Sequence, residues 1–292
     1  MSARGSFSGR IGFILAATGS AIGLSNIWRF PYLAGQHGGA VFLIIYLLCI
    51  FLFCFPVMVG EFAMGRATRR NPYGAYTTLG SKRWALLGLA GVVSSTLILS
   101  YYNVVAAWAF GYFVEISTGS LLGEEDYRAF FGKFVNNVPA NLMYSFAFLF
   151  ATAASVAGGV QKGIERANSI LMPGLLIILL GLIGYSLTLP SAQDGVRFYL
   201  IPDFSEITPQ TIFEALKLSF FTLSLGVGGL MTYGSYMRKD ENIIRSSSVI
   251  TWADTIIAFL AGLMVFPLVF SAGKSPAEGP ALVFIVMPEI FR

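Results

Sequence analysis

Apolar residues gather in seven long runs, separated by short polar connections. The runs lie at about residues 11–34, 40–65, 84–116, 140–158, 167–188, 211–236 and 249–271. An α-helix needs about 20 mainly apolar residues to cross the hydrocarbon core of a bilayer. The pattern therefore predicts an all-α membrane protein with seven transmembrane helices, organised as a single transmembrane domain over residues 1–292.

Two of the runs are interrupted near their centres by glycine and polar residues. The first contains Thr18–Asn26 (TGSAIGLSN), and the sixth contains Phe221–Gly229 (FTLSLGVGG). Lipid offers no hydrogen bonds, so weakened helical backbone persists at mid-membrane depth only where protein or a cavity satisfies its polar groups. Paired interruptions of this kind point to the binding site of a transporter. We therefore expect helices one and six to be broken and to line such a site.

Charged residues in the connections indicate the orientation in the membrane. One side carries Arg4, Arg10, Arg66, Arg69, Arg70, Lys82, Arg83, Lys162, Arg166, Arg238, Lys239 and Arg245; the other carries Glu124, Glu125, Asp126, Asp194, Asp203 and Glu206. Connections rich in Lys and Arg stay on the cytoplasmic side. The pattern predicts a multi-pass protein of the plasma (inner) membrane with a cytoplasmic N-terminus and, after seven spans, an external C-terminus.

The composition excludes an ordinary soluble domain. Apolar residues make up 55% of the chain and charged residues 12%, with a mean hydropathy of +0.71, whereas soluble domains carry about 25% charged residues. The net charge of +4 does not indicate a nucleic-acid partner, because the basic residues sit in short connections between apolar runs. The lipid bilayer is the partner that this composition predicts.

Several polar residues are expected at one depth in the membrane. With a rise of about 1.5 Å per residue, Asn26, Thr222 and Asp254 all lie near mid-membrane. A carboxylate there is costly and marks a functional site with a partner, and oxygen ligands beside broken backbone suit sodium. The alternative is that Asn26 and Thr222 only form hydrogen bonds between helices.

Glu61, near the cytoplasmic end of the second run, is a second acid within the membrane. Two interpretations remain open: it holds unpaired backbone amides of a broken helix, or it relays protons. We favour the first, because two broken helices supply such amides.

The stretch Gly19–Tyr32 (GSAIGLSNIWRFPY) resembles the first-helix signature of neurotransmitter:sodium symporters, especially their bacterial amino-acid branch. The resemblance covers nearly the whole chain and includes EFAMGR at 61–66, Tyr101-Tyr102, KGIER at 162–166, FFTLSLG at 220–226 and YMRKD at 236–240. It implies a LeuT-type inverted-repeat transporter fold. The first repeat would span about 11–188, and the second would begin at about 211 and be incomplete at 292.

The resemblance is to helices one to seven, which leads us to expect a piece of a longer protein. Residues 277–292 are too few to cross the membrane again, and we expect a short external helical loop there. The alternative is a natural seven-helix protein.

The resemblance also implies ligands for sodium and substrate. One sodium site would use the Ala21 carbonyl, Asn26, Thr222, Asp254 and the substrate carboxylate; a second would use the carbonyls of Gly19 and Ile22. Substrate-binding positions would be Ala21, Gly23, Leu24, Ser25, Ile98, Tyr102, Phe221, Thr222, Ser224 and Val227. No other cofactor is implied.

Gate residues follow from the same resemblance. Phe221 would cover the substrate together with Tyr102, and Arg29 would pair with an acid on a later helix to close the external gate. Arg4, Phe7 and Tyr236 would close the cytoplasmic gate.

The implied function is sodium-coupled import of a neutral, hydrophobic amino acid, not an enzymatic activity. Gly23 stands where amine-specific relatives carry aspartate, which favours an amino acid over an amine. Chloride independence is expected because Tyr46 and Thr222 match the chloride site, whereas Leu218 and Ala258 replace two of its donors and Asp254 brings a fixed charge. Whether Asp254 also carries a proton on the return step is left open. The alternatives are a non-transporting fragment of such a protein and a seven-helix membrane sensor. An oligomer is compatible with all of these interpretations.

Overall fold

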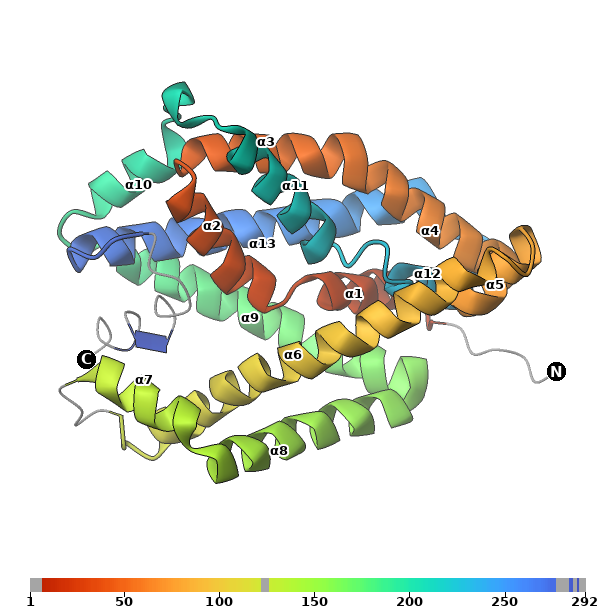
Figure 1. The fold of residues 1–292 in the computed structure, drawn as a ribbon, viewed down its shortest axis with the longest axis horizontal. Coiled ribbons are helices and arrows are strands. Elements are labelled where there is room, and N and C mark those ends of the chain that lie inside the picture. Colours follow the sequence, from red (N-terminus) through yellow and green to blue (C-terminus); the bar gives the residue numbers. More distant parts are fainter. Residues whose placement is uncertain (1–6, 122–125, 277–283, 286–287, 289–292) are drawn as a thin grey trace.

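The first apolar run folds as two helices joined by an extended residue. The computed structural model describes residues 7–121, 126–276, 284–285 and 288. α1 spans Arg10–Ala21 and ends at Ile22, whose backbone is extended (φ −72°, ψ 121°). A π-helical turn, η1 (Ser25–Arg29), leads into α2 (Phe30–Gln36), and the two parts are bent by 51° (Figure 1). The predicted break in helix one is confirmed.

The sixth run is also broken. α11 (Pro209–Thr222) and α12 (Gly229–Tyr236) are separated by residues 223–228. Three residues in this linker have left-handed backbone: Ser224 (φ 53°), Gly226 (φ 79°) and Gly228 (φ 81°). A right-handed helix cannot continue through such residues, and glycine adopts this conformation without steric cost. The glycines noticed in the sequence are thus the physical reason for the break.

The other runs form long helices. They are α3 (Ala40–Cys49), continued by η2 (Ile50–Cys54) and α4 (Phe55–Thr68); α6 (Ala85–Ser117); α8 (Val138–Ala157); η3 (Val160–Glu165), continued by α9 (Arg166–Ser186); and α13 (Ile243–Ser271). Between them lie shorter helices that the apolar pattern did not predict: α5 (Pro72–Leu79), α7 (Tyr127–Asn136), α10 (Ala192–Leu200) and the 3-10 turn η4 (Phe204–Glu206).

Each of the seven apolar runs is present as a helix or as a pair of helices. Within the described residues, five helices are long and apolar enough to cross a membrane, and six if α1 and the helix after its break count as one span. The run at 211–236 is divided by its linker into helices of 14 and 8 residues, as predicted for a broken span, so neither half reaches the length of a span by itself. The external loop expected near residues 277–292 lies almost entirely outside the described residues.

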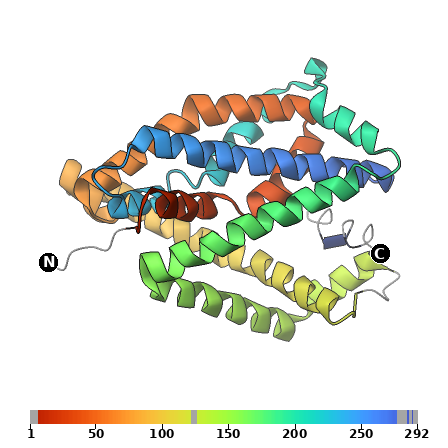
Figure 2. The same ribbon diagram turned by 180° about the vertical axis from the view of Figure 1, so that it is seen from behind.

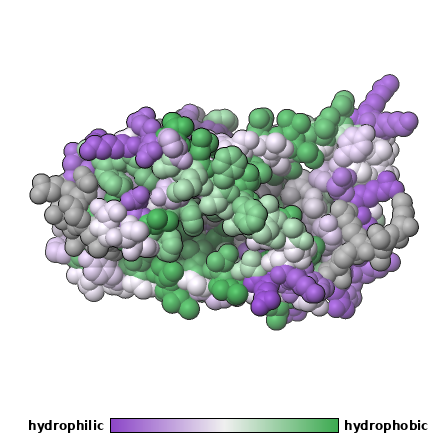
Figure 3. All heavy atoms as spheres, turned by 90° about the horizontal axis from the view of Figure 1, so that it is seen from below, coloured by the Kyte–Doolittle hydropathy of each residue, from purple (hydrophilic) through white to green (hydrophobic). Residues whose placement is uncertain are grey.

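α13 lies at the centre of the molecule, and α8 lies at its periphery (Figures 1 and 2). Of their most apolar stretches, 67% is buried in α13 but only 6% in α8. The outer surface of α8 is nevertheless apolar, as expected of a helix that faces lipid. Figure 3 shows hydrophobic side chains over much of the middle of one face, with hydrophilic side chains mainly toward the ends of the long axis.

Glycines bring α4 and α12 into backbone contact. A Cβ atom added to Gly65 would lie 2.0 Å from the Met231 carbonyl oxygen, and one added to Gly234 would lie 2.7 Å from the Phe62 carbonyl oxygen. Small residues allow such close approach between helices in membranes. This packing fixes the half-helix that follows the break in the sixth run.

Candidate binding site

Asp254 is the centre of a buried polar cluster. It lies on α13 and is completely buried. Its Oδ1 accepts hydrogen bonds from Asn26 Nδ2 (2.8 Å) and Thr222 Oγ1 (3.2 Å), and Thr222 also lies 3.3 Å from Oδ2. The three residues that the sequence placed at one depth therefore meet in space.

The two breaks bring these residues together. Asn26 lies in η1, directly after the break in the first run, and Thr222 is the last residue of α11. The Asn26 Oδ1 atom accepts from the Gly23 N–H (3.0 Å) and from the Ser25 hydroxyl (3.2 Å), so the orientation of this amide is fixed. Each broken helix therefore contributes one side chain to the Asp254 carboxylate.

The cluster is rich in oxygen and poor in positive charge. Within the described residues, no ion pair involves Asp254. A buried carboxylate that only neutral groups contact is strongly destabilising unless a cation or a proton joins it. Hydroxyl, amide and carboxylate oxygens are the ligands that a hard cation prefers. The cluster can therefore hold a small cation.

A cavity of about 670 Å³ lies beside the cluster. Nine of the predicted substrate-binding residues line it: Ala21, Gly23, Ser25, Ile98, Tyr102, Phe221, Thr222, Ser224 and Val227. Gly19 and Ile22, expected at a second sodium site, line it as well. The cavity thus lies between the two broken helices and α6.

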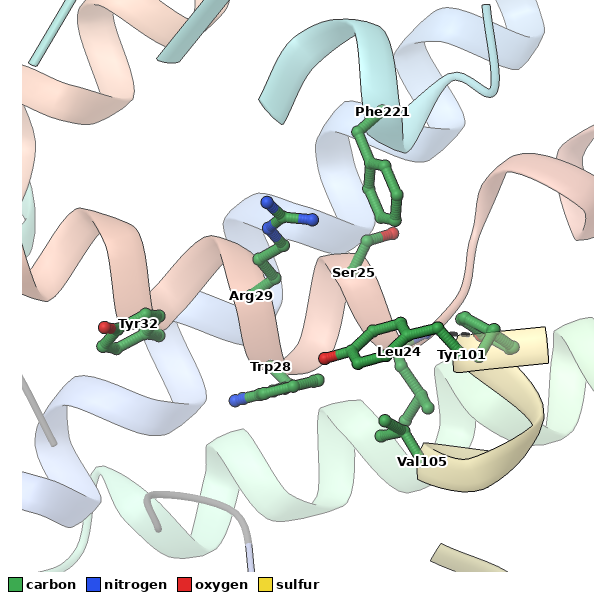
Figure 4. A pocket seen from close by; sticks show the side chains of 9 residues that line it. Leu24, Ser25, Trp28, Arg29, Tyr32, Tyr101, Val105 and Phe221 are labelled. Carbon is green, nitrogen blue, oxygen red and sulfur yellow. Dashed lines mark hydrogen bonds between the residues drawn. The ribbon is translucent and has the colours of Figure 1, made fainter. Parts of the chain in front are cut away.

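A second cavity of about 420 Å³ adjoins the first, since both are lined by Ser25, Tyr102 and Phe221. Figure 4 shows its lining, with the Phe221 ring directed toward Ser25. The tenth predicted substrate-binding residue, Leu24, lines this cavity rather than the larger one, and its backbone N–H donates to the Tyr102 hydroxyl at 3.2 Å. Tyr102 and Phe221 therefore each contribute to the lining of both cavities.

Arg29 contacts an aromatic ring. Its guanidinium carbon lies 4.6 Å from the centroid of the Phe221 ring, a cation–π geometry (Figure 4). The two residues belong to different broken helices and both line the smaller cavity, so this contact links the two helices there.

Two hydrogen bonds hold the linker between α11 and α12. The Gly226 N–H donates to Glu61 Oε1 at 2.7 Å, and the Ser95 hydroxyl donates to the Val227 carbonyl at 2.9 Å. Glu61 is buried on α4 and Ser95 lies on α6. Neighbouring helices thus satisfy backbone groups that the break leaves without helical partners.

Phe7, expected at the cytoplasmic gate, lies among three other aromatic rings. Phe7 is buried and stacks on Tyr233 (6.1 Å between centroids), with Tyr236 at 6.4 Å and Phe13 at 5.3 Å. Arg4, expected to act with these rings, lies outside the described residues.

The connection between α12 and α13 forms several polar contacts. Glu241 forms an ion pair with Arg10 at 3.4 Å, and its backbone carbonyl accepts from Arg66. Hydrogen bonds from the Arg238 guanidinium hold the pKa of the neighbouring Asp240 carboxyl below its usual range.

Sequence reasoning missed several cavity residues. Ser95 lines the larger cavity, and Trp28 and Tyr101 line the smaller one. Ser95 lies three residues before Ile98 and seven before Tyr102, so helical spacing places all three on one face of α6. That spacing could have identified Ser95, whereas Trp28 and Tyr101 follow only from the three-dimensional arrangement.

Comparison with known proteins gives one consistent result. The Sodium:neurotransmitter symporter family matches residues 4–126 and 133–292. An uncharacterized sodium-dependent transporter of Bacillus subtilis, YhdH, is 43% identical over 289 residues, which cover 98% of this chain. An uncharacterized sodium-dependent transporter of Methanocaldococcus jannaschii, MJ1319, is 33% identical over 98% of this chain.

A solved structure is similar over nearly the whole chain. The crystal structure of MhsT in complex with L-phenylalanine superimposes with a TM-score of 0.93 at 45% sequence identity and covers 99% of this chain. This chain spans 66% of the length of MhsT, 64% of the Bacillus subtilis relative and 62% of the Methanocaldococcus jannaschii relative. The similarity therefore concerns about two thirds of each of these proteins.

Proposed function

The chain belongs to the sodium:neurotransmitter symporter family, and from that membership we propose that the complete protein is a sodium-coupled symporter that imports a neutral, hydrophobic amino acid. It would work as a multi-pass membrane protein with a cytoplasmic N-terminus, without chloride and without enzymatic chemistry. The observation that supports this most is the buried cluster of Asn26, Thr222 and Asp254, where both broken helices meet.

Sodium would compensate the charge of Asp254. The present hydrogen-bond donors to its carboxylate, Asn26 and Thr222, are neutral. A cation beside the carboxylate and the Thr222 hydroxyl would gain strongly from the low dielectric constant of a buried site. The Asn26 amide, whose nitrogen now faces Asp254, would turn to present its oxygen to this cation. The Ala21 carbonyl would complete this site, and the Gly19 and Ile22 carbonyls would serve the second one. Coupling follows because sodium and substrate share the same cavity wall.

The substrate would be an amino acid bound through its carboxylate. A Cβ atom at Gly23 would lie 2.9 Å from the Tyr102 hydroxyl, so a larger residue there would displace this hydroxyl. Gly23 leaves room for a substrate carboxylate beside Tyr102 and the start of η1, where a helical N-terminus favours an anion. MhsT, 45% identical to this chain, was solved with L-phenylalanine bound.

The cavity lining favours an apolar side chain. Ile98, Phe221 and Val227 line it, and no described Lys, Arg, Asp or Glu is among its lining residues. A volume of about 670 Å³ admits branched and aromatic amino acids, which we expect to compete best for uptake. Strongest competition by glutamate or lysine would contradict this choice of substrate.

Chloride would not be required, because Asp254 supplies the negative charge. Leu218 and Ala258, which replace two anion donors, are buried and apolar. Tyr46 remains beside Thr222 and Asp254. An ionised Asp254 next to sodium offsets the cation charge as chloride would.

Uptake by the complete protein in proteoliposomes tests the proposal. We expect labelled phenylalanine or leucine to accumulate with an inward sodium gradient, and accumulation to be unchanged when gluconate replaces chloride. The Asp254→Asn variant should lose most uptake in gluconate. Uptake that ignores sodium would overturn the symport mechanism, and wild-type uptake that collapses in gluconate would overturn chloride independence.

A further inference from the structure

The connection between the spans that end at Thr68 and begin at Ala85 is strongly basic. It and its edges contain Arg66, Arg69, Arg70, Lys82 and Arg83, and the sequence has no acidic residue between Glu61 and Glu115. Such an imbalance leaves positive charge without a local acidic partner. Hydrogen bonds and ion pairs within the protein occupy only some of these five side chains.

Two of the five are held by backbone carbonyls. Arg66 donates to the Glu241 carbonyl at 2.5 Å, and Arg69 donates to the Ser235 carbonyl at 3.2 Å. The other three, Arg70, Lys82 and Arg83, are exposed, and their side chains form no hydrogen bond or ion pair with any described residue. These three are free to bind an external anion.

α5 places the free cations at both of its ends. The helix packs back along the start of α6, since a Cβ atom on Gly88 would lie 2.6 Å from the Tyr73 Cα atom. Arg70 precedes α5 by two residues, and Lys82 and Arg83 follow it by three and four residues. An eight-residue helix is about 12 Å long. The cations therefore flank one short surface helix at the end of the molecule (Figure 1).

Exposed apolar side chains lie among these cations. Tyr73 is 51% exposed, Leu79 55% and Trp84 56%. The Trp84 ring packs close to Gly80, within the same turn that carries Lys82 and Arg83. Aromatic residues with one apolar and one polar part are typical of the boundary between membrane and water.

We propose that this α5 basic face, made of Arg70, Tyr73, Leu79, Lys82, Arg83 and Trp84, binds anionic lipid headgroups. The helices that flank it, Ala40–Thr68 and Ala85–Ser117, are both long and apolar enough to cross a membrane, which would place α5 near the membrane surface. The three cations would contact phosphate groups while the tyrosine, leucine and tryptophan side chains enter the headgroup region. This surface lies apart from both cavities, so the inference goes beyond transport itself.

Lipid titration of the purified protein tests the proposal by counting bound lipids with native mass spectrometry. Phosphatidylglycerol should bind more tightly than phosphatidylcholine, and added salt should weaken its binding. Each cation near an anionic surface contributes about fivefold, so the Arg70→Gln/Lys82→Gln/Arg83→Gln variant should lose binding by on the order of 100-fold.

A matched control removes three exposed cations elsewhere: Arg128→Gln/Lys133→Gln/Arg197→Gln. This control should bind phosphatidylglycerol as the wild type does. Equal binding of both lipids by the wild type, or equal loss in both triple variants, would overturn the proposal. The comparison of lipids on the wild type needs no substitution, so it stays decisive if a variant fails to fold. Capture of an acidic peptide with no preference between lipids would point to a protein partner and would also reject the lipid site.

Discussion

At the scale of single residues, the site depends on a few polar side chains whose orientation is fixed by their neighbours. The Asn26 amide is bound at its oxygen by Gly23 and Ser25 and at its nitrogen by Asp254. In this arrangement the amide nitrogen faces Asp254, so the amide must turn before its oxygen can bind a cation beside that carboxylate. Substitutions of Asn26 and Tyr102 test the roles of individual side chains.

Asn26→Ala should weaken sodium binding. The variant loses the amide oxygen proposed as a ligand and the hydrogen bond to Asp254, and hydrogen bonds to charged groups contribute about 1.5–3 kcal/mol. We expect the sodium concentration for half-maximal uptake to rise at least about tenfold. Thr96→Ala is the control, because Thr96 is exposed and bonds only to its own helix. An unchanged sodium requirement in Asn26→Ala would remove this residue from the site.

Tyr102→Phe should weaken substrate binding more than sodium binding. The hydroxyl lost in this variant contacts the Leu24 N–H and faces Gly23, where the substrate carboxylate is proposed to bind. We expect KM for the amino acid to rise about 10- to 100-fold. Tyr101→Phe is a matched control on the adjacent position, and its ring lies mostly exposed beside the smaller cavity. Equal effects of the two substitutions would contradict a specific role for Tyr102.

At the scale of elements, each break needs support from another helix. The linker between α11 and α12 is held by Glu61 of α4 and by Ser95 of α6. The helix that follows it is seated by glycine contacts on α4. The broken helices are therefore weak on their own and defined by the intact helices around them.

Glu61→Gln should destabilise this linker without removing a sodium ligand. A charge-assisted hydrogen bond is about twice as strong as a neutral one, so its weakening should cost about 1–2 kcal/mol. We expect the Tm of the purified protein to fall by a few degrees. Thermal unfolding followed by a fluorescence signal that does not depend on thiol labelling measures this change. Glu115→Gln is the control, because this carboxylate has only a long contact (3.5 Å) to Tyr144. Were Glu61→Gln to melt with the wild type, the carboxylate would not be needed to hold the linker.

At the scale of the whole molecule, we expect charge to set the orientation in the membrane. The basic connections and the acidic connections fall on opposite sides of the spans. α5 and α12 lie at one end of the molecule, and α10 lies at the opposite end (Figures 1 and 2).

Cysteine labelling checks the orientation. Replacing the buried Cys49 and Cys54 by alanine gives a background without native thiols. We expect a membrane-impermeant maleimide to label Ser205→Cys in intact cells and Ser81→Cys only after permeabilisation, since both serines are exposed on opposite sides. Labelling in the reverse order would show that the N-terminus is external.

The sequence by itself determined the class of fold and the positions of the breaks. Bilayer thickness sets the length of apolar runs, and glycine is the residue that accepts left-handed backbone, so both signals are local. The approximate depth of Asn26, Thr222 and Asp254 followed from the constant rise of a helix. The break in run 211–236 leaves two helices, each too short to cross a membrane alone, as predicted for a broken span.

Only the tertiary structure decided which polar groups contact one another. The depth of a residue along its helix does not determine how the helix is rotated about its axis or which helices pack against it. Both depend on packing between residues far apart in sequence. The convergence of Asn26 and Thr222 on Asp254, the support of Gly226 by Glu61 and the placing of Arg29 on Phe221 all join separate helices. The short helix α5 could not be predicted from the sequence, because its eight residues show too weak a periodicity of apolar positions. Its position is set by packing against Gly88 of α6.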